Sequence, residues 1–385
     1  MRNRRVACGR EPVDHTIVEY LEEQRASFSD VPLNDVDSLV LSTISYFRFE
    51  RGVIGRIVPT ELIPLPVAIC GIAHTDLYGN IWLSHERGDE FLAALLSSPR
   101  FMDLKVGYFI NEVSNHFEKQ FSAITFFFPD GSAYVAFRGT DNTLAGWKEN
   151  FNLTFMSELP SQISARTYVE DIADTGVQRL YVGGHSKGGN PAEYSALTCR
   201  DQTFDKIVRV FNHDGPGFAF KPSERIDTPE YEAKLHKTVP ESSVFGMLME
   251  SRSNYRVVRS LGKLFAQHAA THWVVENDDF VTLDAISPEA AIISGTLNNW
   301  AKSYDLEKRG MFIDAVYEIV CAANADTWAQ FAEDGAGSAR AVAEATAKLP
   351  ADMRATLFRM LRDIAPIMGA EAAKQALDKI PGLRD

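Results

Sequence analysis

The chain has 385 residues, of which 45% are hydrophobic, and it carries a formal net charge of −13. This length and composition supply enough apolar side chains for one large core with an appendage. The acidic balance argues against a surface that binds nucleic acid or an anionic membrane.

The N-terminal residues give no sign of a targeting segment. Met1–Arg5 is basic, but Val6–His15 contains no apolar core of a secretory signal. No apolar run approaches the ~18 residues that a membrane span requires. The four cysteines are scattered, with no C-x-x-C pair, which is typical of reduced thiols. We therefore predict a cytoplasmic, soluble protein with no integral membrane segment.

The first half of the chain is predicted to contain helices followed by strands. Apolar residues recur at helical spacing over residues 15–24 and again after Asn34, a residue type that caps helix N-termini. Residues 121–128 and 133–137 are apolar strands joined by a tight turn. The second strand ends in Arg138-Gly-Thr-Asp141.

One stretch organises the rest of the chain. Leu180–Val182 is typical of a short buried strand, and Gly184-His-Ser-Lys-Gly188 follows it as a G-x-S-x-G motif. Residues 189–200 are expected to be helical, with Pro191 in the first turn. A serine on such a strand-to-helix turn needs glycines two positions away, because a Cβ there would collide with the adjoining backbone. The pattern predicts that Ser186 is a nucleophile.

Strands alternate with helices through this region and predict a doubly wound, mostly parallel sheet with helices on both faces. The next strand, residues 207–211, leads into Asn212-His-Asp-Gly-Pro-Gly217. Ligands bind beyond the carboxyl ends of strands in such sheets. Thr140, Ser186 and Asp214 would all emerge at that edge.

The remainder divides into three predicted parts. Residues 244–267 are apolar at helical spacing, which suits either a helical cap over the site or one more packing helix. Residues 273–283 are expected to form a hairpin that closes a catalytic domain of residues 1–286. Residues 287–385 are rich in alanine, leucine and charge, and predict a C-terminal helical module whose apolar stripes pack together or bind a protein partner.

A serine hydroxyl becomes a good nucleophile when a histidine takes its proton and an acid orients that histidine. In sheet hydrolases the chain order is serine, acid, histidine. His268 and His272 both follow every acid candidate, and we prefer His268 because it lies on a turn. For the acid we prefer Asp214, in a Gly-rich turn after a strand, to Glu241, which follows the next extended segment.

The oxyanion formed in acyl transfer requires fixed N–H donors. We expect one from the backbone of Lys187 and a second from the Gly139-Thr140 loop, where the Thr140 hydroxyl can add a further donor. His268-Ala-Ala-Thr-His272 lacks the glutamate of the zinc-protease motif, and no P-loop is present. The sequence predicts neither a metal site nor a cofactor.

Together these motifs resemble the class 3 lipases of the α/β-hydrolase superfamily, and in particular a little-characterised bacterial branch of them. The resemblance covers roughly residues 14–283 and is carried by the following motifs: Phe137-Arg-Gly-Thr140 with Trp147, Gly184-His-Ser-Lys-Gly-Gly189, Asp214-Gly-Pro-Gly217 and Gln267-His268.

The resemblance implies an α/β-hydrolase fold, Ser186 as nucleophile, and Thr140 with Lys187 around the oxyanion. Two positions depart from the pattern of these lipases. Their acid ordinarily follows a later strand, nearer Glu241, and an apolar residue usually occupies the position of Lys187. A cation beside the nucleophile would suit an acidic or phosphate-bearing ester.

We therefore expect a serine hydrolase of the lipase or esterase type, which cleaves a small or lipid-like carboxylic ester through an acyl-enzyme on Ser186. The alternatives are an acyltransferase, peptidase or thioesterase using the same triad, and a catalytically idle hydrolase fold whose C-terminal helices bind a protein.

Overall fold

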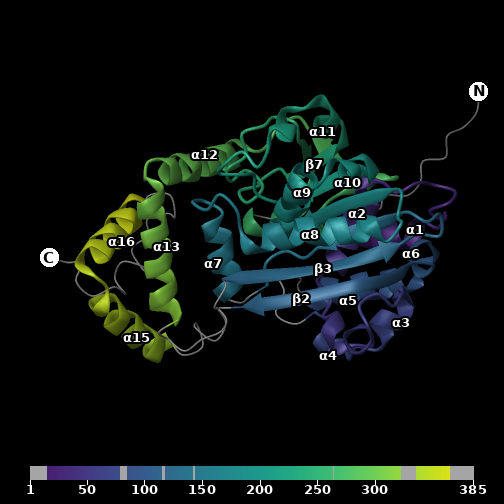
Figure 1. The fold of residues 1–385 in the computed structure, drawn as a ribbon, viewed down its shortest axis with the longest axis horizontal. Helices are drawn as coiled ribbons and strands as arrows, with labels where there is room; N and C mark the ends of the chain where they lie inside the picture. The colour runs from purple at the N-terminus through teal and green to yellow at the C-terminus, as the bar shows by residue number, and fades with distance from the viewer. Residues whose placement is uncertain are drawn as a thin grey trace, which may run out of the picture.

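The computed structural model describes residues 15–78, 85–114, 118–141, 144–262, 264–321 and 335–364. Nine strands of these ranges form one sheet in the order β1-β2-β3-β4-β5-β6-β7-β8-β11. Figure 1 shows the long strands β2 and β3 of this sheet side by side. Their bounds are β1 (Ile63–Pro64), β2 (Lys105–Ser114), β3 (Lys119–Phe127), β4 (Ala133–Phe137), β5 (Leu180–His185), β6 (Ile207–His213), β7 (Leu235–Pro240), β8 (Arg256–Val258) and β11 (Thr282–Leu283).

The centre of the sheet is parallel and its edges are antiparallel. Strands β4 to β8 pair in parallel, whereas β1 to β4 pair with their neighbours in antiparallel fashion, as does β11 with β8. Register aligns Phe137 with Gly184, and His185 with His213. The loops after β4, β5 and β6 therefore leave the sheet side by side, and the predicted α/β class with a parallel centre is confirmed.

Side chains alternate between two cores along the strands, as the pleat requires. Val135, Val182 and Val210 lie in one core with the helices α8, α9, α10 and α11, whereas Tyr134, Tyr181 and Phe211 lie in the other with the N-terminal helices. The helices of the first group are α8 (Pro160–Asp174), α9 (Gly189–Thr198), α10 (Asp201–Lys206) and α11 (Pro229–Lys234). Helices thus cover both faces of the sheet.

The first two helices begin at side-chain caps, of which the sequence predicted Asn34. Thr16 and Asn34 each accept a backbone N–H through the side chain and complete capping boxes with Glu19 and Asp37. Asp37 also forms a buried ion pair with Arg100 at 2.6 Å. The helices of this part are α1 (Ile17–Glu23), α2 (Asp35–Ile44), α3 (Leu65–Cys70), α4 (His74–Leu77), α5 (His85–Ser97) and α6 (Pro99–Met102).

The prediction of a helix over residues 244–267 is wrong. Turns occupy the beginning of this stretch, β8 adds a strand to the central sheet, and one short 3₁₀ helix covers Leu264–His268. A Cβ on Gly246 or Gly262 would overlap neighbouring backbone or side-chain atoms. The compact turns at these two positions therefore require glycine. The predicted hairpin is confirmed by the pairing of β9 (Val275–Glu276) with β10 (Asp279–Phe280).

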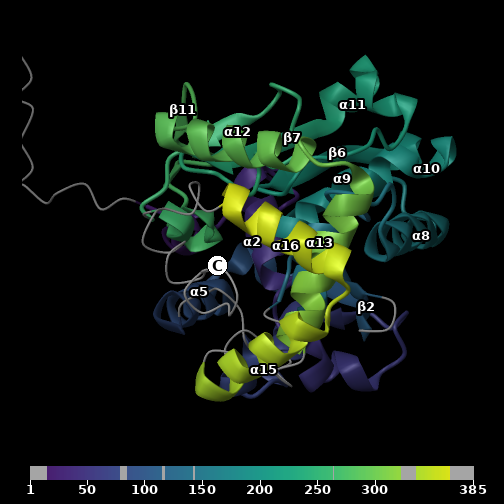
Figure 2. The same ribbon diagram turned by 90° about the vertical axis from the view of Figure 1, so that its left-hand side faces the viewer.

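The C-terminal region is helical, as predicted, and Figures 1 and 2 show its helices gathered at one end of the molecule. Its helices are α12 (Pro288–Lys302), α13 (Leu306–Cys321), α15 (Gly335–Lys348) and α16 (Ala351–Ile364). Phe312, Ala315 and Ile319 of α13 pack with Leu357 and Met360 of α16 in a separate small core.

Helix α13 is joined to α7 (Leu144–Asn152) by an ion pair of 3.1 Å between Lys148 and Asp314. The end of the predicted helical module, residues 365–385, lies outside the described residues. Among the helices that the structure describes, none is both long and apolar enough to cross a bilayer.

Candidate active site

Ser186 lies on the sharp turn between β5 and α9. Its φ is 59°, in the left-handed region that few non-glycine residues adopt, and its side chain is partly exposed. A Cβ on Gly184 would lie 2.3 Å from the carbonyl carbon of Gly188, and a Cβ on Gly188 would lie 2.1 Å from the Phe137 oxygen. The glycines at both ends of G-x-S-x-G are therefore required by the close approach of β4, β5 and α9.

The structure brings Asp214 and His268 together. Asp214 Oδ2 lies 2.6 Å from His268 Nδ1, a distance typical of a charge-assisted hydrogen bond. The Asp214 side chain is buried, whereas that of His268 is 16% exposed and packs against the Phe245 ring. An imidazole held at Nδ1 by a buried carboxylate directs its other nitrogen, Nε2, away from that carboxylate.

The other oxygen of Asp214 is also fixed. Oδ1 accepts hydrogen bonds from the Ser243 hydroxyl and from the Gly246 backbone N–H, the latter at 3.1 Å. Asp214 itself has a φ of 57°, and its N–H donates to the Thr238 carbonyl at 2.8 Å. This left-handed backbone conformation directs the Asp214 carboxylate toward His268. Because the conformation is costly for a non-glycine residue, the surrounding contacts must stabilise it.

The alternative candidates lie elsewhere. Glu241 is contacted by the Gln267 amide at 3.4 Å, and no described contact joins Glu241 to a histidine. His272 is half-buried, and its Nδ1 lies 2.8 Å from the Ala266 oxygen. The preferred acid and base therefore meet, whereas the alternatives do not.

The loop after β4 lies beside the turn of Ser186. Thr140 is buried, and its hydroxyl oxygen accepts a hydrogen bond of 2.6 Å from the Asn150 amide, which leaves the hydroxyl proton for another acceptor. Arg138 anchors the loop through Asn111 at 2.9 Å and Asp141 at 3.3 Å. Gly139 can carry no side chain, because a Cβ would lie 2.0 Å from the Tyr46 hydroxyl.

The side chain of Lys187 does not serve the site in the way that its position in the sequence suggested. Its ammonium group donates to the Gln120 carbonyl at 2.9 Å and forms an ion pair with Glu149, and both side chains are buried. Glu149 also accepts N–H groups from Gln120 and Ser161. The charge of Lys187 is therefore compensated internally, and it gives no support to the expectation of an acidic or phosphate-bearing ester. The backbone N–H of Lys187 remains part of the turn that begins at Ser186.

Tyr46, just beyond α2, is a site residue that the sequence did not indicate. Its hydroxyl lies 3.1 Å from His185 Nδ1, and it also interacts with the backbone N–H of Gly139 and with the Ser186 side chain. His185 Nε2 in turn lies 2.7 Å from the His268 carbonyl oxygen. Because that oxygen only accepts, Nε2 carries the proton and Nδ1 accepts from Tyr46.

Tyr46 and His185 thus link three loops: the loop after β4, the turn of Ser186 and the loop of His268. Burial raises the pKa of Tyr46, so its hydroxyl stays protonated. Burial also lowers the pKa of His185 well below its usual value, and the neighbouring His268 adds to this effect. His185 is therefore a neutral connector. In the sequence, Tyr46 carried no signal beyond that of one more aromatic residue at a helix end.

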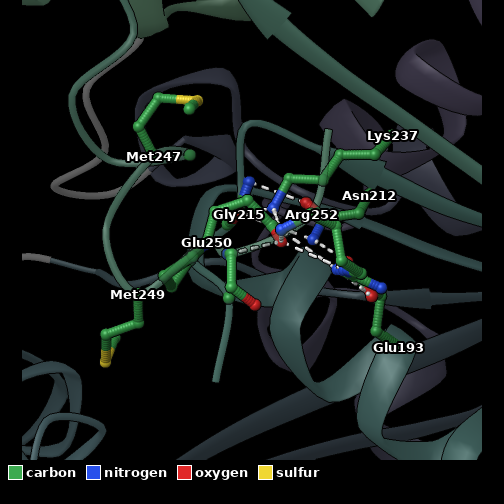
Figure 3. Close-up of polar contacts among 12 residues, drawn as sticks. Glu193, Asn212, Gly215, Lys237, Met247, Met249, Glu250 and Arg252 are labelled. Atoms are coloured by element: carbon green, nitrogen blue, oxygen red, sulfur yellow. Dashed lines mark hydrogen bonds and ion pairs between the residues drawn. The ribbon is translucent and has the colours of Figure 1, made fainter. Parts of the chain in front are cut away.

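A set of buried, charged side chains contacts the loop that contains Asp214 and Gly215 (Figure 3). Lys237 donates to the Gly215 carbonyl at 3.0 Å and to Glu250 at 2.5 Å, and both of these charged side chains are almost fully buried. The Asn212 amide oxygen accepts from the Gly215 N–H at 2.7 Å. Both backbone polar groups of Gly215 are therefore held, which fixes the residue that follows Asp214.

The same set extends through Arg252 to α9. Arg252 pairs with Glu250 at 3.0 Å and with Glu193 at 2.8 Å, and Glu193 also accepts from Asn212. Desolvation alone would raise the pKa of Glu250, but attraction to Lys237 and Arg252 and their hydrogen bonds lower it to about 2. Glu250 is therefore ionised at neutral pH, and each carboxylate of the network contacts a cationic side chain.

No group of three or more His, Cys, Asp or Glu side chains in the described ranges is arranged to hold a metal ion. The arrangement around Ser186 is instead that of an acid–histidine pair, a strained serine turn and a neighbouring loop. This combination suits activation of a hydroxyl nucleophile.

Comparison with known proteins identifies one family. The sequence profile of the Mbeg1-like family matches residues 95–318, a stretch that contains Ser186, Asp214 and His268 and leaves out Tyr46. This family is related to class 3 lipase-like proteins. The match runs through α12 into α13, beyond the domain boundary expected near residue 286. No curated protein matches the chain. Because the matched stretch is more than half of the chain, the protein belongs to the Mbeg1-like family.

Proposed function

We propose that this protein is a serine hydrolase of the α/β-hydrolase type that cleaves a carboxylic ester through an acyl-enzyme on Ser186. The 2.6 Å hydrogen bond between Asp214 and His268, beside the strained turn of Ser186, carries the proposal. Membership of a family related to lipase-like proteins supports it independently. A cytoplasmic location is part of the same proposal.

In this mechanism His268 takes the proton of the Ser186 hydroxyl as that oxygen attacks the ester carbonyl carbon. Asp214 keeps the proton of His268 on Nδ1, so that Nε2 is the basic nitrogen, and stabilises the imidazolium that forms. The negative charge moves to the carbonyl oxygen, where the N–H of Lys187 and the Gly139-Thr140 loop supply donors.

Collapse of this intermediate breaks the ester C–O bond, and His268 returns the proton to the departing alcohol. Water then attacks the carbonyl carbon of the acyl-enzyme while His268 takes a proton from it. His268 gives this proton to the Ser186 oxygen as the acyl C–O bond breaks, which releases the carboxylic acid. Tyr46 acts as a positioning residue, because it touches the loop of the proposed oxyanion donors and the neighbour of the nucleophile.

Covalent labelling with a fluorophosphonate probe tests this proposal. We expect the purified protein to be labelled, and labelling to disappear in Ser186→Ala and His268→Ala. Ser242→Ala, which removes another partly exposed hydroxyl, is the matched control and should be labelled like the wild type. Turnover of ester substrates should fall on the order of 10⁶-fold in Ser186→Ala. Labelling that survives Ser186→Ala, or a folded wild-type protein that is never labelled, would refute the proposal.

The acyl acceptor distinguishes a hydrolase from an acyltransferase or thioesterase that uses the same groups. Incubating the enzyme with an ester in the presence of an added alcohol or thiol, and quantifying free acid against transferred acyl group, separates these activities. We expect free acid to dominate.

A further inference from the structure

A cavity of about 540 Å³ lies between α12, the start of α13 and the loops that follow β6 and β7. Its apolar lining includes Phe218, Phe220, Met249 and Leu306. In Figure 3 the Met249 side chain points away from the ion pairs of Glu250 and Arg252. The cavity has the volume of a typical small-molecule site and the apolar character of one. Neither Ser186 nor His268 lines it.

Most of the charges on its wall are already neutralised by partners. Lys221 forms an ion pair with Asp227 at 2.7 Å, and both line the cavity. Glu250 is shared between Lys237 and Arg252, and Arg252 also pairs with Glu193. These groups therefore offer a ligand little net charge.

Two cations on the wall have no such partner. Arg309 donates from Nε to the Tyr304 carbonyl at 2.9 Å and from Nη1 to the Thr154 carbonyl at 2.7 Å. Lys302 lines the same wall. Within the part of the chain that the structure describes, no carboxylate lies at ion-pair distance from either side chain. Desolvation lowers the pKa of Arg309, and the attraction of Asp305 offsets only part of this effect. The Asp305 carboxylate is itself ion-paired with Lys308.

We propose that this cavity binds an amphipathic anion, with a carboxylate or phosphate head at Arg309 and Lys302 and an apolar tail against Phe218, Phe220 and Met249. The excess of positive charge is local, since the chain as a whole carries −13. A guanidinium with two N–H groups anchored on carbonyls is oriented in advance, so that less freedom is lost when it binds the anion. The site is separate from Ser186 and does not depend on the proposed catalytic role.

The direct test is calorimetric titration of the full-length Ser186→Ala protein, in which no ester chemistry can intervene. The probes are decanoate, decyl phosphate and the neutral decanol, which separate the two head groups from the tail alone. We expect at least one anion to bind and decanol to bind much more weakly.

Two variants test whether the anion binds in this cavity. Arg309→Gln should weaken binding of the anion about 10- to 100-fold, the usual effect of losing a hydrogen bond to a charged group. Ala301→Phe should abolish it by filling the cavity. The matched control is Arg340→Gln, which removes an exposed arginine of α15 that is paired with Glu344. Thermal unfolding of each variant checks that it is folded.

A photoreactive decanoate analogue should crosslink to peptides containing residues 218–221, 249–252 or 298–309. Equal affinity of the wild-type background, Arg309→Gln and Ala301→Phe would overturn the proposal, as would crosslinks confined to other regions or absence of binding by both anions. Each of these outcomes is independent of fluorophosphonate labelling, so failure here and failure of the proposed hydrolase are distinguishable.

Discussion

His185 Nε2 lies 2.7 Å from the backbone oxygen of His268, so the residue before the candidate nucleophile also holds the loop of the candidate base. The ring centroids of His185 and His268 are 4.7 Å apart. A cationic His185 would repel the imidazolium that the proposed reaction forms on His268, and the lowered pKa of His185 prevents this. The contact therefore positions His268 through a neutral hydrogen bond.

The first prediction identifies the acid. Asp214→Asn should reduce kcat by about 10⁴-fold, because an amide in that place favours the wrong tautomer of His268. Glu241→Gln should leave kcat within a few-fold of wild type, since Glu241 contacts Gln267 rather than a histidine. Steady-state kinetics of both variants on one ester test this prediction. A larger loss of kcat in Glu241→Gln than in Asp214→Asn would contradict the assignment of Asp214 as the acid.

The second prediction concerns Tyr46. Tyr46→Phe should lower kcat/KM about 10- to 100-fold, because displacement of donors by a fraction of an ångström is costly in a preorganised site. Tyr134→Phe removes an equally buried hydroxyl, which contacts Ser38 and Ser42 away from the site, and should change stability but not kcat. Similar kinetic losses in both variants, or none in Tyr46→Phe, would show that Tyr46 is merely structural.

The third prediction is a pH dependence of stability that arises from His213. This residue is buried between Ser38 at 2.9 Å and Thr238 at 2.7 Å, and burial lowers its pKa to about 3. The unfolded chain binds a proton near pH 6.5, whereas the folded chain does not until about pH 3, so stability falls on acidification between these values. From pH 7 to pH 5 this loss amounts to about 2 kcal/mol.

Urea unfolding of wild type and His213→Gln at both pH values measures this loss. His213→Gln should be less stable at pH 7, and the difference from wild type should shrink at pH 5. The contribution of His185, which has the same sign, is present in both proteins and cancels. A difference that does not change with pH would contradict a neutral His213.

The fourth prediction concerns the charges behind Asp214. Lys237→Met removes the shorter of the two hydrogen bonds to the Gly215 carbonyl and leaves Glu250 with one cation fewer. We therefore expect a loss of about 3–5 kcal/mol in the free energy of unfolding. Lys308→Met, at an exposed ion pair with Asp305, should change stability by less than about 1 kcal/mol. Chemical denaturation compares the two, and equal effects would mean that the buried network contributes no more than a surface pair.

Several features of the site could be predicted because their requirements are local. A serine between two glycines after a buried strand can adopt few conformations, and strand order then limits where an acid and a histidine emerge. The N-caps Thr16 and Asn34 are also local signals, although the sequence indicated only Asn34. These parts depend on short-range sterics and hydrogen bonds.

The features that could not be predicted depend on tertiary contacts. Tyr46 follows α2 and reaches Gly139 and His185, which are more than 90 residues away along the chain. The direction of the Lys187 side chain was set by Glu149, whose burial beneath the loop no local pattern reveals. In residues 244–267, apolar spacing resembled a helix, whereas close packing of Gly246 and Gly262 and pairing with β7 produced turns and a strand.

The position of Tyr46 has a consequence for how this protein can be divided. The stretch shared with the Mbeg1-like family begins at residue 95, yet α2 covers the sheet and delivers Tyr46 from outside that stretch. An excised fragment of residues 95–318 would leave Tyr134 and Phe211 without the helix that packs on them. The matched stretch therefore begins inside a packed core, and the segment before residue 95 contributes Tyr46 to the candidate site.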